Sequence, residues 1–150
     1  MEINIIIKAF KELTIEELYT LLKLRNEVFV VEQNCVYLDT DDKDQSSFHL
    51  MVFKDNLLAG YTRLVPAGLS YPEVSIGRVV TAAQFRGNGF GKQLMELAIE
   101  GCYEKFGKVD IRISAQHHLI KFYGCVGFVT VGDMYMEDGI PHIGMLKRYL

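Results

Sequence analysis

Short stretches in which apolar and polar residues alternate recur along the chain, and this period of two predicts β-strands. The clearest stretch is 109–115, where Val109, Ile111 and Ile113 share one side and polar residues take the other. A hairpin is expected where Asp55 and Asn56 separate two such stretches. The full set of expected strands is 3–10, 48–54, 57–65, 74–81, 109–115, 128–136 and 140–146.

Three other segments repeat their apolar residues with the spacing of a helix. Thr14 is expected to cap the first helix, because Glu17 three residues later completes a capping box. The second helix follows a glycine-rich segment at 86–91, and the third ends before Gly127. The apolar stripes are Leu18, Leu21, Leu22, Val28 and Phe29 in the first helix, Phe90, Leu94, Leu97, Ala98 and Gly101 in the second, and Leu119, Phe122 and Tyr123 in the third.

The order of these elements predicts the fold class. One strand and one or two helices precede three antiparallel strands, after which come a helix, a strand, a helix and two strands. This order indicates an α+β fold, with a central, mixed and mostly antiparallel sheet and helices on its faces. A length of 150 residues suits one hydrophobic core, so residues 1–150 are expected to form a single domain.

Charge and composition limit the kinds of molecule that the protein is expected to bind. The net charge is −3 and Lys and Arg form no run, which argues against bulk electrostatic binding of nucleic acid. No apolar run approaches the ~20 residues that span a bilayer, and the acidic start is unlike a signal peptide. A soluble, cytoplasmic protein without a membrane partner is therefore expected. The cysteines, Cys35, Cys102 and Cys125, are odd in number and far apart, which favours free thiols.

An acidic loop at 39–44 contains four aspartates and invites comparison with a calcium site. The EF-hand spacing requires Gly and Glu at the positions of Asp44 and Leu50, so that interpretation fails. The loop is then either solvated or an acidic rim that attracts a cationic amine. No metal site is expected at His117 and His118 either, since no third ligand stands at metal spacing.

Arg25 lies on the apolar stripe of the first helix, seven residues after Leu18. An unpaired guanidinium on an apolar face is costly, so a buried acidic or carbonyl partner is expected. Two interpretations stay open for Arg25: a structural ion pair, or a role in the substrate site.

The segment 79–92 carries the strongest chemical signal. A strand ends, a loop follows, and a helix begins among Gly87, Gly89 and Gly91. A helix start has unpaired N–H groups and partial positive charge, and glycines let a phosphate approach that backbone. A Walker loop would need Ser or Thr at Gln93, and a Rossmann turn would need Gly at Lys92. Neither phosphate-binding class fits.

The pattern Arg86, Gly89 and Gly91 instead resembles the acetyl-CoA pyrophosphate loop of GNAT acetyltransferases. A second stretch, 116–128, resembles the other GNAT signature: a helix that ends in Tyr123, three further residues, and then Gly127-Phe128. The family often has Asn where this chain has Gln116, which retains an amide of different reach. The wider resemblance, to the ElaA-like subgroup, covers essentially the whole chain and includes 24–35, 70–72, 76–80, 114–116 and 137–142.

The resemblance implies a GNAT fold, acetyl-CoA as co-substrate and no metal. A cleft is expected between strands 74–81 and 109–115, and the pantetheine arm is expected to pair with the edge of 79–81. The residues expected to contact the coenzyme are Val79, Val80, Thr81, Arg86, Gly87, Asn88, Gly89, Phe90, Gly91, Lys92, Gln116 and Phe122.

The expected reaction is direct attack of a small-molecule or peptide amine on the thioester. In the family the tyrosine protonates the departing thiolate, and Tyr123 is expected to do so here. Candidates for the base that deprotonates the amine are Glu32, His49 and His142. Arg78 is expected either to bind a substrate carboxylate or to pair with Glu32.

Two other functions stay open. The segments 25–33 and 63–66 also resemble acyl-homoserine-lactone synthases, which would transfer a different acyl group on the same scaffold. A CoA-binding sensor without turnover is the non-enzymatic alternative. The sequence leaves open whether the protein is a homodimer.

Overall fold

The computed structural model describes residues 1–150 and contains one seven-stranded sheet in the order β1-β2-β3-β4-β5-β7-β6. All neighbouring strands are antiparallel except β4 and β5, which are parallel. The α+β fold with a mixed, mostly antiparallel sheet is therefore confirmed. The strands are β1 (Ile3–Ala9), β2 (Phe48–Lys54), β3 (Leu57–Val65), β4 (Val74–Thr81), β5 (Ile111–Gln116), β6 (Val129–Glu137) and β7 (Ile140–Lys147).

The β2–β3 hairpin has the predicted bounds. Its two turn residues, Asp55 and Asn56, both have positive φ, as the tight turn between twisted strands requires. The predicted strand 109–115 begins later, at Ile111, because both of its neighbours pair with it only from that residue onward. A strand needs a partner for its backbone hydrogen bonds, and Val109 and Asp110 have none.

The helices are α1 (Ile15–Arg25), α2 (Phe90–Phe106) and α3 (Ile120–Gly124), with short 3₁₀ turns at Phe10–Glu12, Asp44–Ser46, Ala83–Phe85 and His117–Leu119. The capping box of α1 is present: Thr14 Oγ1 accepts from Glu17 N at 3.0 Å, and Glu17 Oε1 accepts from Thr14 N at 2.8 Å. None of the helices is both long and apolar enough to cross a membrane.

A π-helical segment, η2 (Asn26–Glu32), continues α1 without a break. Its wider turns appear in the bond from Gln33 N to Val28 O, at 3.0 Å. The helical spacing of the sequence predicts a helix here but not this change of period. Wide turns of this kind occur often at functional sites, and η2 contributes Val28, Phe29 and Glu32 to the main cavity of the protein.

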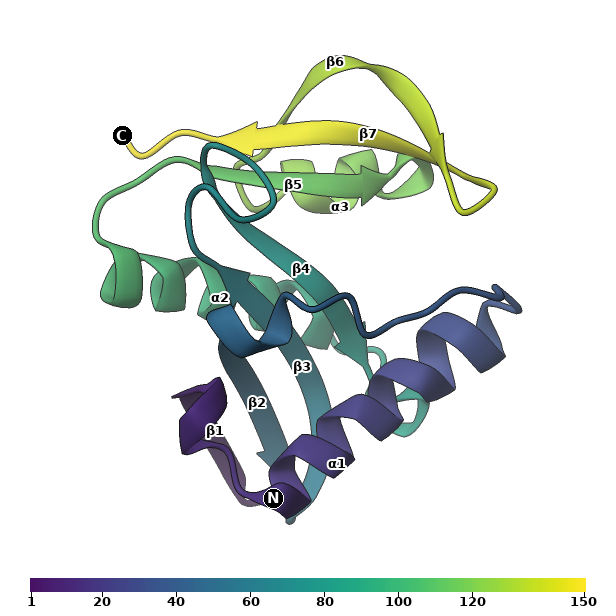
Figure 1. Cartoon of the computed structure of the whole chain (residues 1–150), viewed down its shortest axis with the longest axis vertical. Helices are drawn as coiled ribbons and strands as arrows, with labels where there is room; N and C mark the ends of the chain where they lie inside the picture. The colour runs from purple at the N-terminus through teal and green to yellow at the C-terminus, as the bar shows by residue number, and fades with distance from the viewer.

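Two apolar clusters cover opposite faces of the sheet, with α1 on one face and α2 on the other (Figure 1). The larger cluster contains Leu50 and Leu94, and the smaller contains Leu21 and Met51. Adjacent residues of β2 thus belong to different clusters, as side-chain alternation along a strand requires. Burial on both faces holds the central strands rigidly, so residues at their ends are well positioned.

The three cysteines are free thiols, as predicted. Cys102 is buried in the larger cluster, and burial raises the pKa of its thiol to about 12. Cys125 is exposed. No group of three or more His, Cys, Asp or Glu side chains lies close enough together to bind a metal ion.

Candidate active site

The sheet opens between its two parallel strands. β4 and β5 pair only at Val74 with Ile111 and Ser75 with Arg112, and then diverge. A cavity of about 490 Å³ occupies the opening. It is lined by β4 residues 76–81, by Ile113, Ser114 and Gln116 of β5, by η2, and by Arg86, His118, Leu119, Tyr123, Glu137 and His142. Residues distant in sequence therefore meet in one cleft.

A β-bulge interrupts β4 at the centre of this cleft. The β3–β4 register shifts between Tyr61 and Arg63, so that Arg78 and Val79 together face Thr62. Arg78 has a φ of 51°, which is unusual for a residue other than glycine. A bulge disrupts the hydrogen-bond ladder locally and re-aims the backbone. The opposite edge of β4, which faces the cavity, has no strand partner after Ser75, because β5 pairs only with Val74 and Ser75.

At the start of α2 the backbone turns through left-handed conformations, with φ values of 100° at Gly87, 55° at Asn88 and 74° at Gly89. The N–H groups of Gly87–Gly89 and those of Gly91 and Lys92 donate to no acceptor in the protein. Several free N–H groups at the positive end of a 17-residue helix are suited to accept an anion.

Arg86 stands between this loop and the cavity and forms a two-point ion pair with Glu32 of η2. Arg86 Nη1 lies 2.7 Å from Glu32 Oε2, and Nη2 lies 3.0 Å from Oε1. The hydrogen bonds from Arg86 hold the pKa of the Glu32 carboxyl below its usual value. Both side chains are partly exposed, at 38% and 45%, so the pair is weakly held and can exchange partners.

Tyr123 of α3 lines the cavity but is 91% buried, since its ring packs against Phe122 and Phe128. Burial raises the pKa of its phenol to about 12. A phenol with such a pKa stays protonated at neutral pH and remains available as a proton donor.

His142 of β7 also lines the cavity. Its Nδ1 lies 2.8 Å from the carbonyl oxygen of Ile140, which can only accept, so Nδ1 carries the proton. Nε2 is then left with a free lone pair, 3.4 Å from Glu137 Oε2. The ring is stacked on Tyr135 at a centroid distance of 6.2 Å. This arrangement fixes the orientation of the ring and leaves Nε2 unused by the backbone.

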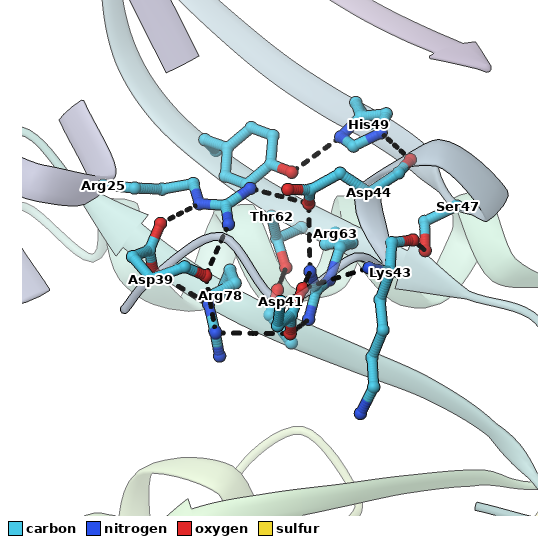
Figure 2. A network of polar contacts seen from close by, with 12 residues as sticks. Arg25, Asp39, Asp41, Lys43, Asp44, Ser47, His49, Thr62, Arg63 and Arg78 are labelled. Atoms are coloured by element: carbon cyan, nitrogen blue, oxygen red, sulfur yellow. Dashed lines mark hydrogen bonds and ion pairs between the residues drawn. The ribbon is translucent and has the colours of Figure 1, made fainter. Parts of the chain in front are cut away.

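A buried ionic network lies next to the cavity on the α1 side (Figure 2). Arg25 is fully buried; its Nε lies 2.7 Å from Asp39 Oδ2 and its Nη1 lies 2.8 Å from Asp44 Oδ1. Arg63 forms a two-point pair with Asp41, at 2.7 and 2.8 Å, and Nη1 also reaches Asp44. The network attaches the loop between η2 and β2 to the sheet.

Arg78 extends the same network from the bulge. Its Nη2 donates to the carbonyl oxygen of Asp39 at 2.9 Å and to Asp41 Oδ2 at 3.3 Å. Its Nε lies 2.9 Å from Asp39 Oδ1 but is not aligned for a hydrogen bond. The side chain lines the cavity as well, so the network forms part of its wall.

Sequence and structure comparisons agree with this geometry. The profile of the acetyltransferase (GNAT) domain matches residues 14–149. A UPF0039 protein of Synechocystis is 43% identical over 99% of this chain and 97% of its own length, and Escherichia coli ElaA is 40% identical over 93% and 92%. The chain belongs to the GNAT acetyltransferase family. A solved acyl-CoA N-acyltransferase from Pseudomonas aeruginosa, 43% identical, superposes with a TM-score of 0.92 over 97% of this chain and 99% of that one.

Membership confirms the predicted GNAT fold and the resemblance to ElaA. As a GNAT protein, the chain is an acyltransferase that uses an acyl-CoA donor. Several residues predicted for the GNAT site lie together in the cleft: Val79, Val80, Thr81, Arg86, Gln116, Tyr123, Glu32, Arg78 and His142. Gly87, Asn88, Gly89, Gly91 and Lys92 follow Arg86 as the loop with free N–H groups.

Some predicted roles are wrong for this GNAT structure. The His49 side chain is fully buried, with Nδ1 2.7 Å from Tyr61 Oη and Nε2 2.9 Å from the carbonyl oxygen of Asp44. Burial lowers the pKa of this imidazole, and both of its nitrogens are used. His49 is a structural histidine outside the cleft, not a base. Arg25 likewise takes the structural alternative, since none of its guanidinium is accessible to a substrate.

The acidic loop is neither solvated nor a rim, because Asp39 and Asp44 are buried in ion pairs. Arg78 pairs with this loop and not with Glu32, which pairs with Arg86. The Phe90 side chain packs in the core beside Leu94, and its N–H donates to Gly87 O at 3.2 Å, so Phe90 shapes the loop without contacting a ligand.

Phe122 does not line the cavity. Its ring packs against the start of α2, where a Cβ placed on Gly91 would lie 3.5 Å from it. Sequence reasoning missed Ser114 and Glu137, which line the cleft. Ser114 was visible as an outward-facing polar residue of an alternating strand, and Glu137 as the first residue of a tight turn, but neither pattern marks a site.

Proposed function

We propose that this protein is an acetyl-CoA-dependent N-acetyltransferase in which the amine of a small molecule or peptide attacks the thioester directly. The main support for the proposal is that one continuous cleft joins all the parts of the site. The cleft extends from Arg86, beside the free amides that open α2, along the edge of β4 to Tyr123 and His142. An anion site, a strand edge, an acid and a base thus follow one another along a path that suits an extended coenzyme.

In the proposed complex, the diphosphate binds the N–H groups at 87–92 and Arg86 releases Glu32 in favour of it. The pantetheine amides add to the edge of β4 at Val79–Thr81 as a short extra strand. The thioester carbonyl then lies by the bulge, where a backbone N–H near Val80 stabilises the oxyanion. The rigid, doubly packed strand supplies the positioning on which most of the acceleration depends.

The chemical step starts from the cationic amine. His142 Nε2 takes a proton from the ammonium, and the neutral nitrogen then forms a bond to the acyl carbon. The carbon–sulfur bond breaks, the Tyr123 phenol donates its proton to the sulfur, and the phenolate regains a proton from the acylated nitrogen. An N-acyl product and free CoA result, and His142 releases its proton to the solvent. The orientation of His142 by the Ile140 carbonyl and the raised pKa of Tyr123 support these assignments.

A two-stage experiment tests the proposal. Calorimetry first measures the binding of acetyl-CoA and of longer acyl-CoAs; thiol release with a panel of amines then measures turnover. Preference for acetyl-CoA together with amine-dependent thiol release is expected. Tight binding without turnover on any amine indicates a sensor, and preference for a long acyl group indicates a different acyl transfer.

Gly89→Glu provides the binding-deficient variant, because it places a carboxylate where the diphosphate is proposed to bind. Gly68→Glu is its matched control, since Gly68 also has positive φ and open space around it but lies outside the cleft. Undiminished coenzyme binding by Gly89→Glu contradicts the loop assignment.

A further inference from the structure

A second, smaller cavity adjoins the cleft. It has a volume of about 220 Å³ and shares Ile76, Gly77, Arg78, Ser114 and Glu137 with the larger one. Its remaining walls come from the loop after η2, the end of β3 and the loop before β4. A molecule whose amine reaches His142 in the cleft therefore has room for its other end in this cavity.

Lys43 is the one cation of this cavity whose charge is not balanced within the protein. The network behind it contains three arginines and three aspartates, so its formal charges cancel. Lys43 is half-buried and lines the cavity, yet Nζ forms no ion pair and no hydrogen bond. Figure 2 shows its side chain leading away from the network, and Lys43 is bonded only through its backbone: its N–H donates to Asp41, and its carbonyl oxygen accepts from Ser47 Oγ.

Hydroxyl groups add further donors to the same cavity. Ser75 is only 4% exposed, and its Oγ has no hydrogen-bond partner. Ser70 lines the cavity with a hydroxyl that is equally unpartnered, and Tyr71 contributes a phenol. The serine hydroxyls and the Lys43 ammonium line one cavity and are not engaged within the protein, whereas Asp41 in the same wall is already paired with an arginine. The cavity thus offers donors for one small anion.

We propose that the second cavity binds the carboxylate of the acceptor, and that the acceptor is a free amino acid or a similarly small zwitterion. This inference rests on the proposed function. Lys43 pairs with the carboxylate and Ser75 donates a hydrogen bond to it. The two arginines of this wall are already paired with aspartates, so Lys43 is its one unpaired cation, which suits a single negative charge better than a phosphate dianion.

Glu137 suits the other end of the same molecule. Its carboxylate lines both cavities and lies 3.4 Å from Nε2 of His142. It can hold the arriving ammonium until His142 removes a proton. Because the two cavities share five lining residues, one small molecule can place its amine beside His142 and its carboxylate beside Lys43. The N-terminus of a long peptide would place its carboxylate elsewhere.

The test compares the kcat/KM of proteinogenic amino acids with that of their carboxamides, in the wild type and in Lys43→Met, with acetyl-CoA saturating. For the amino acid with the preferred side chain, kcat/KM of the free acid is expected to be roughly ten- to a hundredfold higher than that of its carboxamide. This is the effect of one charge-assisted hydrogen bond. Lys43→Met should lower the value for the acid by the same factor and leave the amide unchanged. Lys23→Met, on the exposed face of α1, is the matched control.

Ser75→Ala is a second variant that keeps the shape of the site. It should lower kcat/KM for the free amino acid by roughly two- to tenfold and again leave kcat/KM for the carboxamide unchanged. Three outcomes would overturn the carboxylate site while the acetyltransferase function stands. They are equal kcat/KM for acids and carboxamides, equal losses for both in Lys43→Met, and transfer only to peptide N-termini.

Absence of turnover on every amine would refute the proposed function instead. The carboxylate site is then decided by calorimetry of the amino acid panel against the CoA-loaded protein. Saturable binding by the wild type, lost in Lys43→Met, supports the site, and no binding by the wild type overturns it.

Discussion

Tyr123 and His142 illustrate how local contacts assign chemistry to single residues. Both line the cleft, and the surroundings of each select one role. An apolar environment keeps the Tyr123 phenol protonated, and a backbone carbonyl makes Nδ1 the protonated nitrogen of His142. These surroundings support the proposed roles of Tyr123 as the acid and His142 as the base.

Replacing Tyr123 by Phe should lower kcat by roughly 10²- to 10⁴-fold, because the thiolate would leave without a proton. Affinity for acetyl-CoA should change little, since the ring and its packing are retained. Steady-state kinetics and calorimetry measure the two effects separately. An unchanged kcat refutes the acid role, and a parallel loss of affinity shows that Tyr123 acts mainly by binding.

His142→Gln should lower kcat by a similar factor while it retains a polar side chain of comparable size. Steady-state kinetics with saturating acetyl-CoA measure the loss. His118→Gln, which changes another histidine of the cleft, is the control. An unchanged kcat in His142→Gln would contradict the base role.

At the scale of elements, η2 links the two halves of the site. The helix that begins at the Thr14 cap changes to a π-helix and carries Glu32 to Arg86, 54 residues away in sequence. The end of this helical segment is thereby joined to the loop that is proposed to bind the diphosphate. Binding of the coenzyme and release of the Glu32 carboxylate are expected to be one event.

Glu32→Gln should therefore tighten acetyl-CoA binding, because Arg86 would no longer be held by a carboxylate that competes with the diphosphate. An exposed ion pair of this kind predicts an increase in affinity of roughly two- to fivefold. Calorimetry at low salt gives the comparison. Glu27→Gln is the matched control, on the same helical segment and paired only with Lys23. Weaker binding by Glu32→Gln would contradict the competition.

At the scale of the whole molecule, the buried network joins the loop 39–44 to α1, β3 and the bulge of β4. Burial alone would raise the pKa of Asp44, but Arg25 and Arg63 outweigh burial and hold it below its usual value. A carboxyl with a lowered pKa in the folded state stabilises the fold above its unfolded pKa of about 3.9. This contribution is lost as the pH falls through the folded-state pKa.

Asp44→Asn should lower the free energy of unfolding by about 3 to 5 kcal/mol at neutral pH, because Arg25 would lose a buried partner. The difference from the wild type should shrink in strong acid, where Asp44 itself is protonated. Denaturant unfolding across pH measures both effects. Asp42→Asn is the control, since Asp42 is exposed and has a positive φ that Asn tolerates. A difference that grows in acid would contradict this linkage.

The local features of the fold were predictable because their causes lie within a few residues. The cap at Thr14, the turn at Asp55-Asn56 and the alternating strands each depend on neighbours in sequence. The same holds for the anion loop, since a helix start among glycines exposes N–H groups wherever the chain places it. The place of Tyr123 in the cleft could be predicted because its motif includes the helix that carries it.

Only the tertiary structure decided which charged and titratable side chains belong to the site. His49 and His142 look alike in sequence, yet one lies between two buried partners and the other lines the cleft. Asp39 and Asp44 look solvated until three arginines from distant elements meet them. The physical reason is that the role of an ionisable group depends on its burial and on its partners, and strand pairing and helix packing set both across dozens of residues.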